Sequence, residues 1–443
     1  MICKLALTAL ALLALATAQA QVSLSTQTGA TTQAQTAPVV LTLADALARA
    51  KVNSPQFQAA VTELGLARED RYQARAALLP GVDYNNSFIY TQGNGTASGR
   101  YIASNGVHEY ISQGVAHEAI GAAQVLDYQR SAAAHALAKA RAEIAARGLT
   151  VTVVQSYYGL LAAQTRTGNA ERAYGEGQHF LDLSQKLEQG GEVAHSDTIK
   201  AQIQANDLQR ARDEAKLAEQ NARLSLAVLL FPNFFQDFTL VNDLNQAPAL
   251  PPMNELQQMA ATNNPELQGA FAALAVSNKQ VGVARAGYLP TLSVDMFYGI
   301  DANQFAKRGP DGIQNLGYAG MATLNIPVWN WGATQSKVRQ AELQRHQAQV
   351  ELSAAQRQAI ADLQSFYAEA QLAYQLLRTL QQTAELAEQS LRLTNLRYQA
   401  GEASALEVVD AQNTLTSAGN SYHDGEARYH LAIANLQTLT GAF

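Results

Sequence analysis

Two stretches of the chain alternate apolar and polar residues with a period of two, the pattern of a half-buried β-strand. They follow Pro80 and Pro290, and each leads into a loop rich in Gly, Ser and Asn and then into a return stretch. The return is clear in the second case and weak in the first, around Val107–Ile120. The sequence therefore predicts two β-hairpins. Their alternating apolar residues are Val82, Tyr84, Phe88, Tyr90, Leu292, Val294, Met296, Tyr298, Leu316, Tyr318, Ala322, Leu324 and Ile326.

A second pattern places apolar residues at alternating spacings of three and four, as in a coiled-coil seam. It lies between Gly332 and Gly401, a stretch without proline. At about 1.5 Å per residue, one helix over this stretch would be on the order of 100 Å long. We expect it to form part of a wall, because an ordinary buried helix shows a wider apolar face. The seam is Leu363, Phe366, Ala370, Ala373, Leu377, Leu380, Ala384, Ala387, Leu391, Thr394 and Tyr398.

Proline marks where helices end, because in a helix interior it costs about 3 kcal/mol or more. The chain has no proline from 81 to 231 or from 328 to 443. We therefore expect, in each half, a helix that begins near Asp45 or Glu255 and stops at Pro80 or Pro290. The hairpin and a long helical stretch follow it.

The same elements occur twice because the chain is a tandem duplication. Four short matches share one offset of 210 residues. We predict repeats at 41–230 and 254–441, joined by an aromatic, proline-rich linker at 231–253 that packs beside the helices. The matches are Asn53-Ser54-Pro55 with Asn263-Asn264-Pro265, Leu79-Pro80 with Leu289-Pro290, Gly190-Gly191-Glu192 with Ala400-Gly401-Glu402, and Ala201-Gln202 with Ala411-Gln412.

The N-terminus has the pattern of a cleaved secretory signal. Lys4 precedes an apolar run at 5–16, and Ala18-Gln19-Ala20 is a small-x-small cleavage site. The run is shorter than the about 20 residues that a membrane-spanning helix needs. We expect residues 1–20 to be removed and 21–40, which lack periodicity, to be disordered. Cys3, the only cysteine, is then lost, so the mature chain has neither an acyl anchor nor a disulfide.

Charge and motifs exclude several functions. Without Lys4, 30 Lys and Arg face 37 Asp and Glu, a net charge of −7 that is spread along the chain. A basic patch for nucleic acid is therefore absent. The chain has no phosphate loop, nucleophile elbow or metalloprotease motif, and we expect no enzyme activity and no cofactor. His423 and His430 are seven residues apart, but a metal site would need further ligands, and we predict no metal.

The predicted strands have the about 9–11 residues that a tilted membrane strand requires. Two hairpins supply four strands, whereas a closed membrane barrel needs about eight or more. Two or three chains would therefore have to share one barrel. A soluble hairpin packed on the helices gives the same alternation, so a periplasmic coiled-coil scaffold or adaptor without a barrel is the alternative.

Two motifs resemble those of the TolC-like outer-membrane efflux proteins, over about 41–441. The first resembles the family's Y-x-x-G-x-x-S-x-x-[DE]-V-x-D-A tip motif, and the second its junction from strand into long helix. The resemblance implies a mainly α fold with a membrane β-barrel part. The residues are Tyr398, Gly401, Ser404, Glu407, Val408, Asp410 and Ala411-Gln412, and Ile326, Pro327, Val328, Trp329, Asn330, Trp331 and Gly332.

The resemblance also implies an assembly. In it, a homotrimer in outer-membrane lipid combines a twelve-stranded β-barrel with a coiled-coil α-barrel that extends into the periplasm. Through a periplasmic adaptor (membrane fusion protein) it meets an inner-membrane pump, for drug efflux or type I secretion, and substrates pass unchanged. The implied adaptor contacts are Gly190, Gly191, Glu192, Gly401 and Glu402.

A periplasmic gate is implied near the same tips. Glu407 and Asp410 match acidic constriction positions, one helical turn apart. The family's closed gate can use an arginine where this chain has Ala403, and the first-half copy of the junction, near 119–122, lacks the proline and the aromatic residue. Trp329 and Trp331 fit an interfacial aromatic belt or packing at the junction equally well. The implied gate residues are Glu407, Asp410, Ser196, Asp197 and Tyr398.

Overall fold

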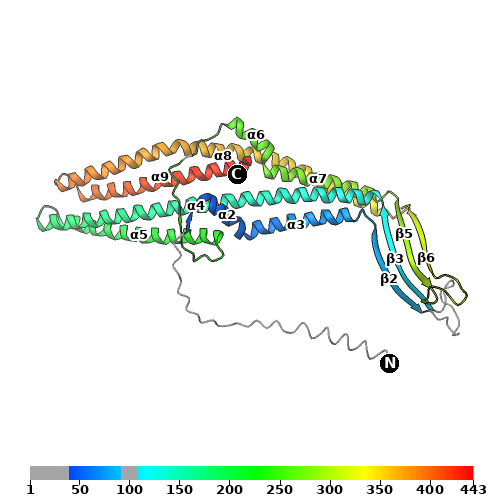
Figure 1. The fold of residues 1–443 in the computed structure, drawn as a ribbon. Coiled ribbons are helices and arrows are strands. Elements are labelled where there is room, and N and C mark those ends of the chain that lie inside the picture. Colours follow the sequence, from blue (N-terminus) through cyan, green and yellow to red (C-terminus); the bar gives the residue numbers. More distant parts are fainter. Residues whose placement is uncertain (1–38, 91–107, 247, 443) are drawn as a thin grey trace, which may run out of the picture. The chain divides into compact units, whose positions relative to one another are not determined.

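The computed structural model describes residues 39–90, 108–246 and 248–442 (Figure 1). The expected signal peptide, nearly all of the N-terminal tail and the loop between the two strands of the first predicted hairpin lie outside these residues. The elements are β1 (Val39–Leu41), α2 (Leu43–Asn53), α3 (Pro55–Ala76), β2 (Gly81–Tyr90), β3 (His108–Ile120), α4 (Ala122–Gln189), α5 (His195–Leu230), β4 (Phe238–Leu240), α6 (Met253–Asn263), α7 (Pro265–Ala286), β5 (Thr291–Ala302), β6 (Leu316–Asn325), α8 (Ala333–Gln399) and α9 (Ala405–Thr440).

The helix expected before each hairpin is in fact two helices, so that prediction was wrong. Ser54 has extended backbone angles, and its hydroxyl accepts a hydrogen bond from the Phe57 N–H at 3.3 Å. Asn264 does the same for Leu267 at 2.9 Å in the second half. A residue before proline avoids the helical region, and a serine or asparagine there caps the next helix.

The long helices agree with the predicted seam. α4 has 68 residues and α8 has 67, and all the seam positions on α8 are buried or half-buried. α5 packs against α4, and α9 packs against both α8 and α4, so the two helical hairpins lie side by side. No helix in the described part of the chain combines the length and the apolar character that crossing a membrane would require.

The four long strands form one antiparallel sheet in the order β2-β3-β5-β6. Tyr84, Gly114, Tyr298 and Tyr318 lie in one cross-strand row, which places the even-numbered residues on one face. The opposite face mixes polar residues with apolar ones such as Val115 and Phe297. On this face the His117 Nδ1 atom lies 2.6 Å from the Asp295 carboxylate, between the two halves of the chain. The weakly patterned return strand is therefore β3, which pairs with both β2 and β5.

The linker packs against the helices as predicted. The buried Tyr157 of α4 donates its hydroxyl proton to the Val241 carbonyl at 2.8 Å. Tyr429 of α9 donates to the Pro248 carbonyl at 2.5 Å, and His430 lies 3.1 Å from the Leu244 carbonyl. Burial raises the pKa of Tyr157 and that of Tyr429 to about 12, so both hydroxyls remain protonated donors.

Candidate functional site at the helical tips

The turns at 190–194 and 400–404 end the two helical hairpins (Figure 1). Just behind them, all four long helices share one buried apolar cluster, here called the tip core. Because the cluster draws on both hairpins, it fixes one tip against the other. Its buried members are Phe180, Leu181, Ala201, Ala205, Tyr398, Ala405 and Val408.

Tyr398, a predicted gate residue, lies inside the tip core and is only 2% exposed. Its hydroxyl is 3.0 Å from Ser184 Oγ on α4. Ser184 donates its own proton to the Phe180 carbonyl at 2.9 Å, so Tyr398 is the donor between the two hydroxyls. The Tyr398 ring also meets the Phe180 ring at a tilt of 61°. Tyr398 therefore connects the two hairpins within one chain.

Glu407 lies in the first turn of α9, where Ser404 caps the helix. The Ser404 N–H donates to one Glu407 carboxylate oxygen at 3.0 Å, and the Glu407 N–H donates to the Ser404 hydroxyl, a capping box. The other carboxylate oxygen is 3.2 Å from Arg397 of α8. The Ser404 N–H, the Ser404 hydroxyl and Arg397 lower the pKa of Glu407.

Arg397 was missed by the sequence analysis. It also donates to the Glu402 carbonyl at 3.0 Å, so it bridges the tip turn from the last turn of α8. A cation is therefore present at this tip without an arginine at 403, and Ala403 packs against the tip core instead. The available signal was a basic residue near a helix C-terminus, where it complements the helix dipole.

The first tip uses different pairs. Asp197 lies 3.0 Å from the Lys200 ammonium, one turn along α5, and Ser196 is exposed. No hydrogen bond or ion pair within the described structure joins these two predicted gate residues to Glu407 or to the exposed Asp410. The predicted gate residues therefore share an end of the helices but are not bonded as a single group.

Glycine allows both turns. Gly191 and Gly401 have a φ of 76°, in the left-handed region that favours glycine, whereas Gly190 has an ordinary φ of −76°. An added Cβ at Gly191 or Gly401 would meet no atom within 4 Å. All five predicted contact residues, including Glu192 and Glu402, are exposed. The tips thus present a small polar surface.

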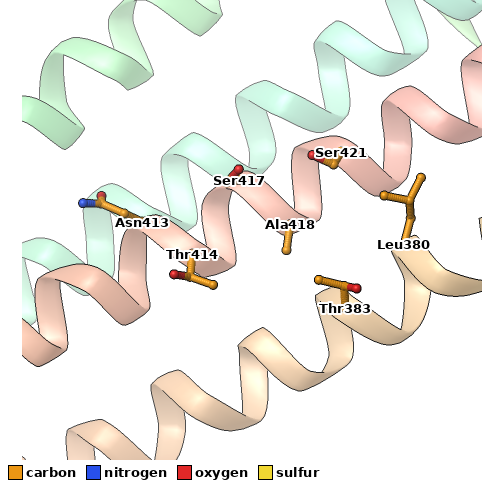
Figure 2. Close-up of a pocket in the computed structure, with 7 residues that line it drawn as sticks. All are labelled: Leu380, Thr383, Asn413, Thr414, Ser417, Ala418 and Ser421. Atoms are coloured by element: carbon orange, nitrogen blue, oxygen red, sulfur yellow. The ribbon is translucent and has the colours of Figure 1, made fainter.

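Behind the tips, side chains of α8 and α9 line a cavity of about 450 Å³ (Figure 2). Its lining has hydroxyl and amide groups but no ionisable side chain. Among the described residues, no group of three or more His, Cys, Asp and Glu is placed to hold a metal. The arrangement thus suits a polar wall more than a reaction site. The lining residues are Leu380, Thr383, Asn413, Thr414, Ser417, Ala418 and Ser421.

The junction residues lie between β6 and α8. Asn330 donates to the Thr334 hydroxyl, and Gly332 caps α8 with a φ of 81°. Trp329 and Trp331 lie in no strand but in the segment that connects β6 to α8. Pro327 precedes them in the connecting segment, where a missing N–H leaves no ladder hydrogen bond unmade.

Known proteins match both the sequence and the fold. Residues 256–442 match the family model "Outer membrane efflux protein". The chain is 25% identical to alkaline protease secretion protein AprF of Pseudomonas aeruginosa, over 90% of this chain and 84% of that protein. It is 24% identical to outer membrane protein TolC of Vibrio cholerae, over 90% of each. The CmeC outer membrane channel of Campylobacter jejuni superposes with a TM-score of 0.79 at 17% identity, covering 90% of this chain and 85% of CmeC. The second half of the chain therefore matches the outer membrane efflux protein family, and 90% of the chain is similar in sequence and fold to TolC-like outer-membrane proteins.

Proposed function

We propose that three copies of this chain form an exit duct across the outer membrane and periplasm. Each copy, built from repeats 41–230 and 254–441 and the linker 231–253, supplies four strands to a shared twelve-stranded β-barrel and four long helices to an α-barrel. One observation carries the proposal. In the duplication, α8 corresponds to α4 and α5 corresponds to α9. The exposed faces of α8 and α5 are therefore the counterparts of the faces through which α4 and α9 contact each other within the chain.

That internal interface joins α4 to α9. Asn169 donates to Asn420 at 3.2 Å, and Arg166 pairs with Asp424 at 2.6 Å. Ala162 of α4, one turn beyond Arg166, is buried. Because the duplication relates α4 to α8 and α9 to α5, it predicts an equivalent contact between α8 of one copy and α5 of the next.

The equivalent faces are apolar and open. Leu372 on α8 is 46% exposed, whereas its counterpart Ala162 on α4 is buried. Leu224 on α5 is 44% exposed, whereas its counterpart Ala434 on α9 is buried. Large apolar residues are thus exposed where the duplicated positions are covered. A second copy would remove them from water, a favourable change of about 25 cal/mol per Å² of apolar surface.

The sheet leads to the same arrangement. β2 and β6 are its two edges, and neither has a second neighbour among the described strands. Unpaired edge groups are costly in lipid, and pairing β2 of one copy with β6 of the next would satisfy them. The two joined faces differ, so the contact is head-to-tail and closes as a ring. The family resemblance sets the ring at three copies.

The tips provide the contact with the other proteins of the transport system. We assign the exposed Gly190, Gly191, Glu192, Gly401 and Glu402 to a periplasmic adaptor that connects the duct to an inner-membrane pump. The relatives named for protease secretion and as TolC support a passive duct for secretion or efflux. The alternative, a periplasmic coiled-coil scaffold, does not need a sheet with one apolar face and two open edges.

Cysteine cross-linking tests the assembly. The contacts at 169 and 166 place Ala162 opposite Ala427, so the duplicated positions Leu372 and Leu217 should meet between copies. The only natural cysteine, Cys3, falls in the predicted signal peptide. Outer membranes containing the Leu372→Cys, Leu217→Cys double variant, treated with a short bismaleimide, should give a ladder that ends at trimer.

A matched control uses Leu343→Cys with Leu217→Cys. Leu343 is also exposed on α8 but lies 29 residues away, on the order of 40 Å along the helix. This pair should stay monomeric on denaturing gels. A ladder ending at dimer would reject three copies, and absence of cross-linking in the first pair, or a soluble monomer, would reject the ring.

A further inference from the structure

The junction between β6 and α8 holds both tryptophans of the chain. Their rings contact each other nearly at right angles, with centroids 5.9 Å apart and planes inclined by 73°. Trp329 is 74% exposed and Trp331 is 89% exposed. Neither indole N–H has a hydrogen-bond acceptor among the described residues. The chain therefore presents an aromatic pair with free donors to whatever surrounds it.

The backbone holds this pair outward. Trp331 has a φ of 55° and is, among the described residues, the only one other than glycine with a positive φ. A bulky side chain rarely adopts this conformation, because it brings Cβ close to the backbone. Asn330 and Gly332, on either side, hold the turn through the Thr334 hydroxyl and the start of α8. Since this strain does not place the ring against the protein, packing within the chain does not explain it.

The pair continues the apolar face of the sheet. Leu324 lies on that face of β6, and Ile326 and Val328 follow it toward the tryptophans; all three are exposed. Tyr288, also exposed, precedes β5 at the same end, because Thr291 pairs with Asn325. An aromatic group with a free polar edge next to a lipid-facing surface is typical of a membrane interface.

A cavity of about 290 Å³ opens beside Trp329. Its lining combines apolar groups of Val328 and Trp329 with hydrogen-bonding groups of Tyr288, Asn330 and Gln335. It contains no charged side chain. This mixture matches the glycerol and carbonyl region of a phospholipid better than an ion, because neutral donors face an apolar wall.

We propose that Trp329, Trp331 and this cavity form an anchor for phospholipid in the periplasmic leaflet of the outer membrane. The assignment to this leaflet follows from α8, which leaves the sheet at this end toward the periplasmic tips. The inference rests on the sheet being inserted in the membrane as in the proposed duct. The first half of the chain has Ala119 and Gly121 at the duplicated positions, so each copy carries one such anchor.

Intrinsic fluorescence tests the anchor directly, because the two tryptophans are the only ones in the sequence. The purified protein is placed in phosphatidylcholine vesicles whose acyl chains carry bromine near either the headgroup or the methyl end. Shallow bromine should quench the emission more than deep bromine, and aqueous iodide should quench it weakly. The single variants Trp329→Phe and Trp331→Phe separate the two rings.

A matched control moves the probe to water. In a Trp329→Phe, Trp331→Phe background, Phe235→Trp places one tryptophan at an exposed position of the linker, remote in sequence from the sheet. Its emission should be quenched by iodide and not by brominated lipid. The control shows that lipid quenching depends on position and is not a general effect of the vesicles.

Each alternative occupant gives a distinct result. Strong iodide quenching without lipid quenching would place the pair in water, and quenching by neither would place it between copies of the chain. Stronger quenching by deep bromine would place it in the acyl core. Any of these overturns the anchor. Ion conductance of the same vesicles is recorded separately. Vesicles that conduct ions but show no quenching by shallow bromine would reject the anchor and keep the duct. Quenching by shallow bromine without ion conductance would reject the duct alone.

Discussion

Replacing Tyr398 by phenylalanine should make the tips open more often. The change removes one hydroxyl from a side chain that is 2% exposed and keeps the ring, including its contact with Phe180. The lost hydrogen bond to Ser184 is 3.0 Å long and connects α8 to α4. Ser184 keeps its own bond to the Phe180 carbonyl, so no new buried donor is left unpaired.

The expected size of the effect on opening follows from the loss of one hydrogen bond. A neutral buried hydrogen bond contributes about 1 kcal/mol net, which changes an equilibrium about fivefold. If opening separates α8 from α4, each copy should favour the open form by roughly that factor. Ser184→Ala should have at least the same effect, because it leaves the buried tyrosine hydroxyl without an acceptor. The double variant should add little, since both changes remove one bond.

Single-channel recording in planar bilayers measures the fraction of time open. Tyr157→Phe is the matched control, because Tyr157 is also buried and loses a hydrogen bond of 2.8 Å, but to the linker carbonyl of Val241. It should lower thermal stability by a similar amount and leave opening unchanged. If Tyr398→Phe opens no more often than the Tyr157 control, the tip core does not hold the channel closed.

Three further predictions concern the second tip. Hydrogen bonds and Arg397 lower the pKa of Glu407, so its stabilisation of the tip is present above its unfolded pKa and lost as pH falls through the lower folded value. Acid should therefore open the wild-type channel, and Glu407→Gln should abolish that response. An equal response in both proteins would exclude Glu407 as the group that senses pH. The Glu407→Ala, Asp410→Ala double variant should lose cation preference and block by divalent cations in bilayer recordings, and unchanged selectivity would place both carboxylates outside the duct. Gly401→Val forces valine into a left-handed conformation, so it should abolish transport in cells and keep the heat-resistant trimer. The control variant Gly175→Val, on an exposed helix face, should transport normally. Normal transport by both variants would mean that the tip turn is not the docking site.

Local periodicity accounts for what could be predicted. The seam from Leu363 to Tyr398 and the strands after Pro80 and Pro290 were found because apolar spacing depends only on residues close in sequence. The 210-residue offset then transferred each element from one half to the other, including the weak return strand that became β3. The break at Ser54 was also readable, since a serine before proline is a helix-capping signal that we did not use.

The roles of the tip residues could not be predicted in this way. Tyr398 and Glu407 stand in a motif that marks the tip, but the motif does not show that Tyr398 is buried against Ser184 or that Glu407 is bonded to Ser404 and Arg397. The Tyr398 contact joins residues 214 positions apart, and the Arg397 contact crosses a hairpin turn.

The sequence by itself determined the elements, their duplication and their lengths, because spacing, proline and glycine act through local backbone geometry. Tertiary structure alone decided which groups meet at the tips and which faces stay open. Leu372 and Ala162 hold the same place in the two repeats, yet only the packing of α4 on α9 shows that one is covered and the other exposed. Burial depends on the position of neighbouring helices, and that position is a property of the whole fold.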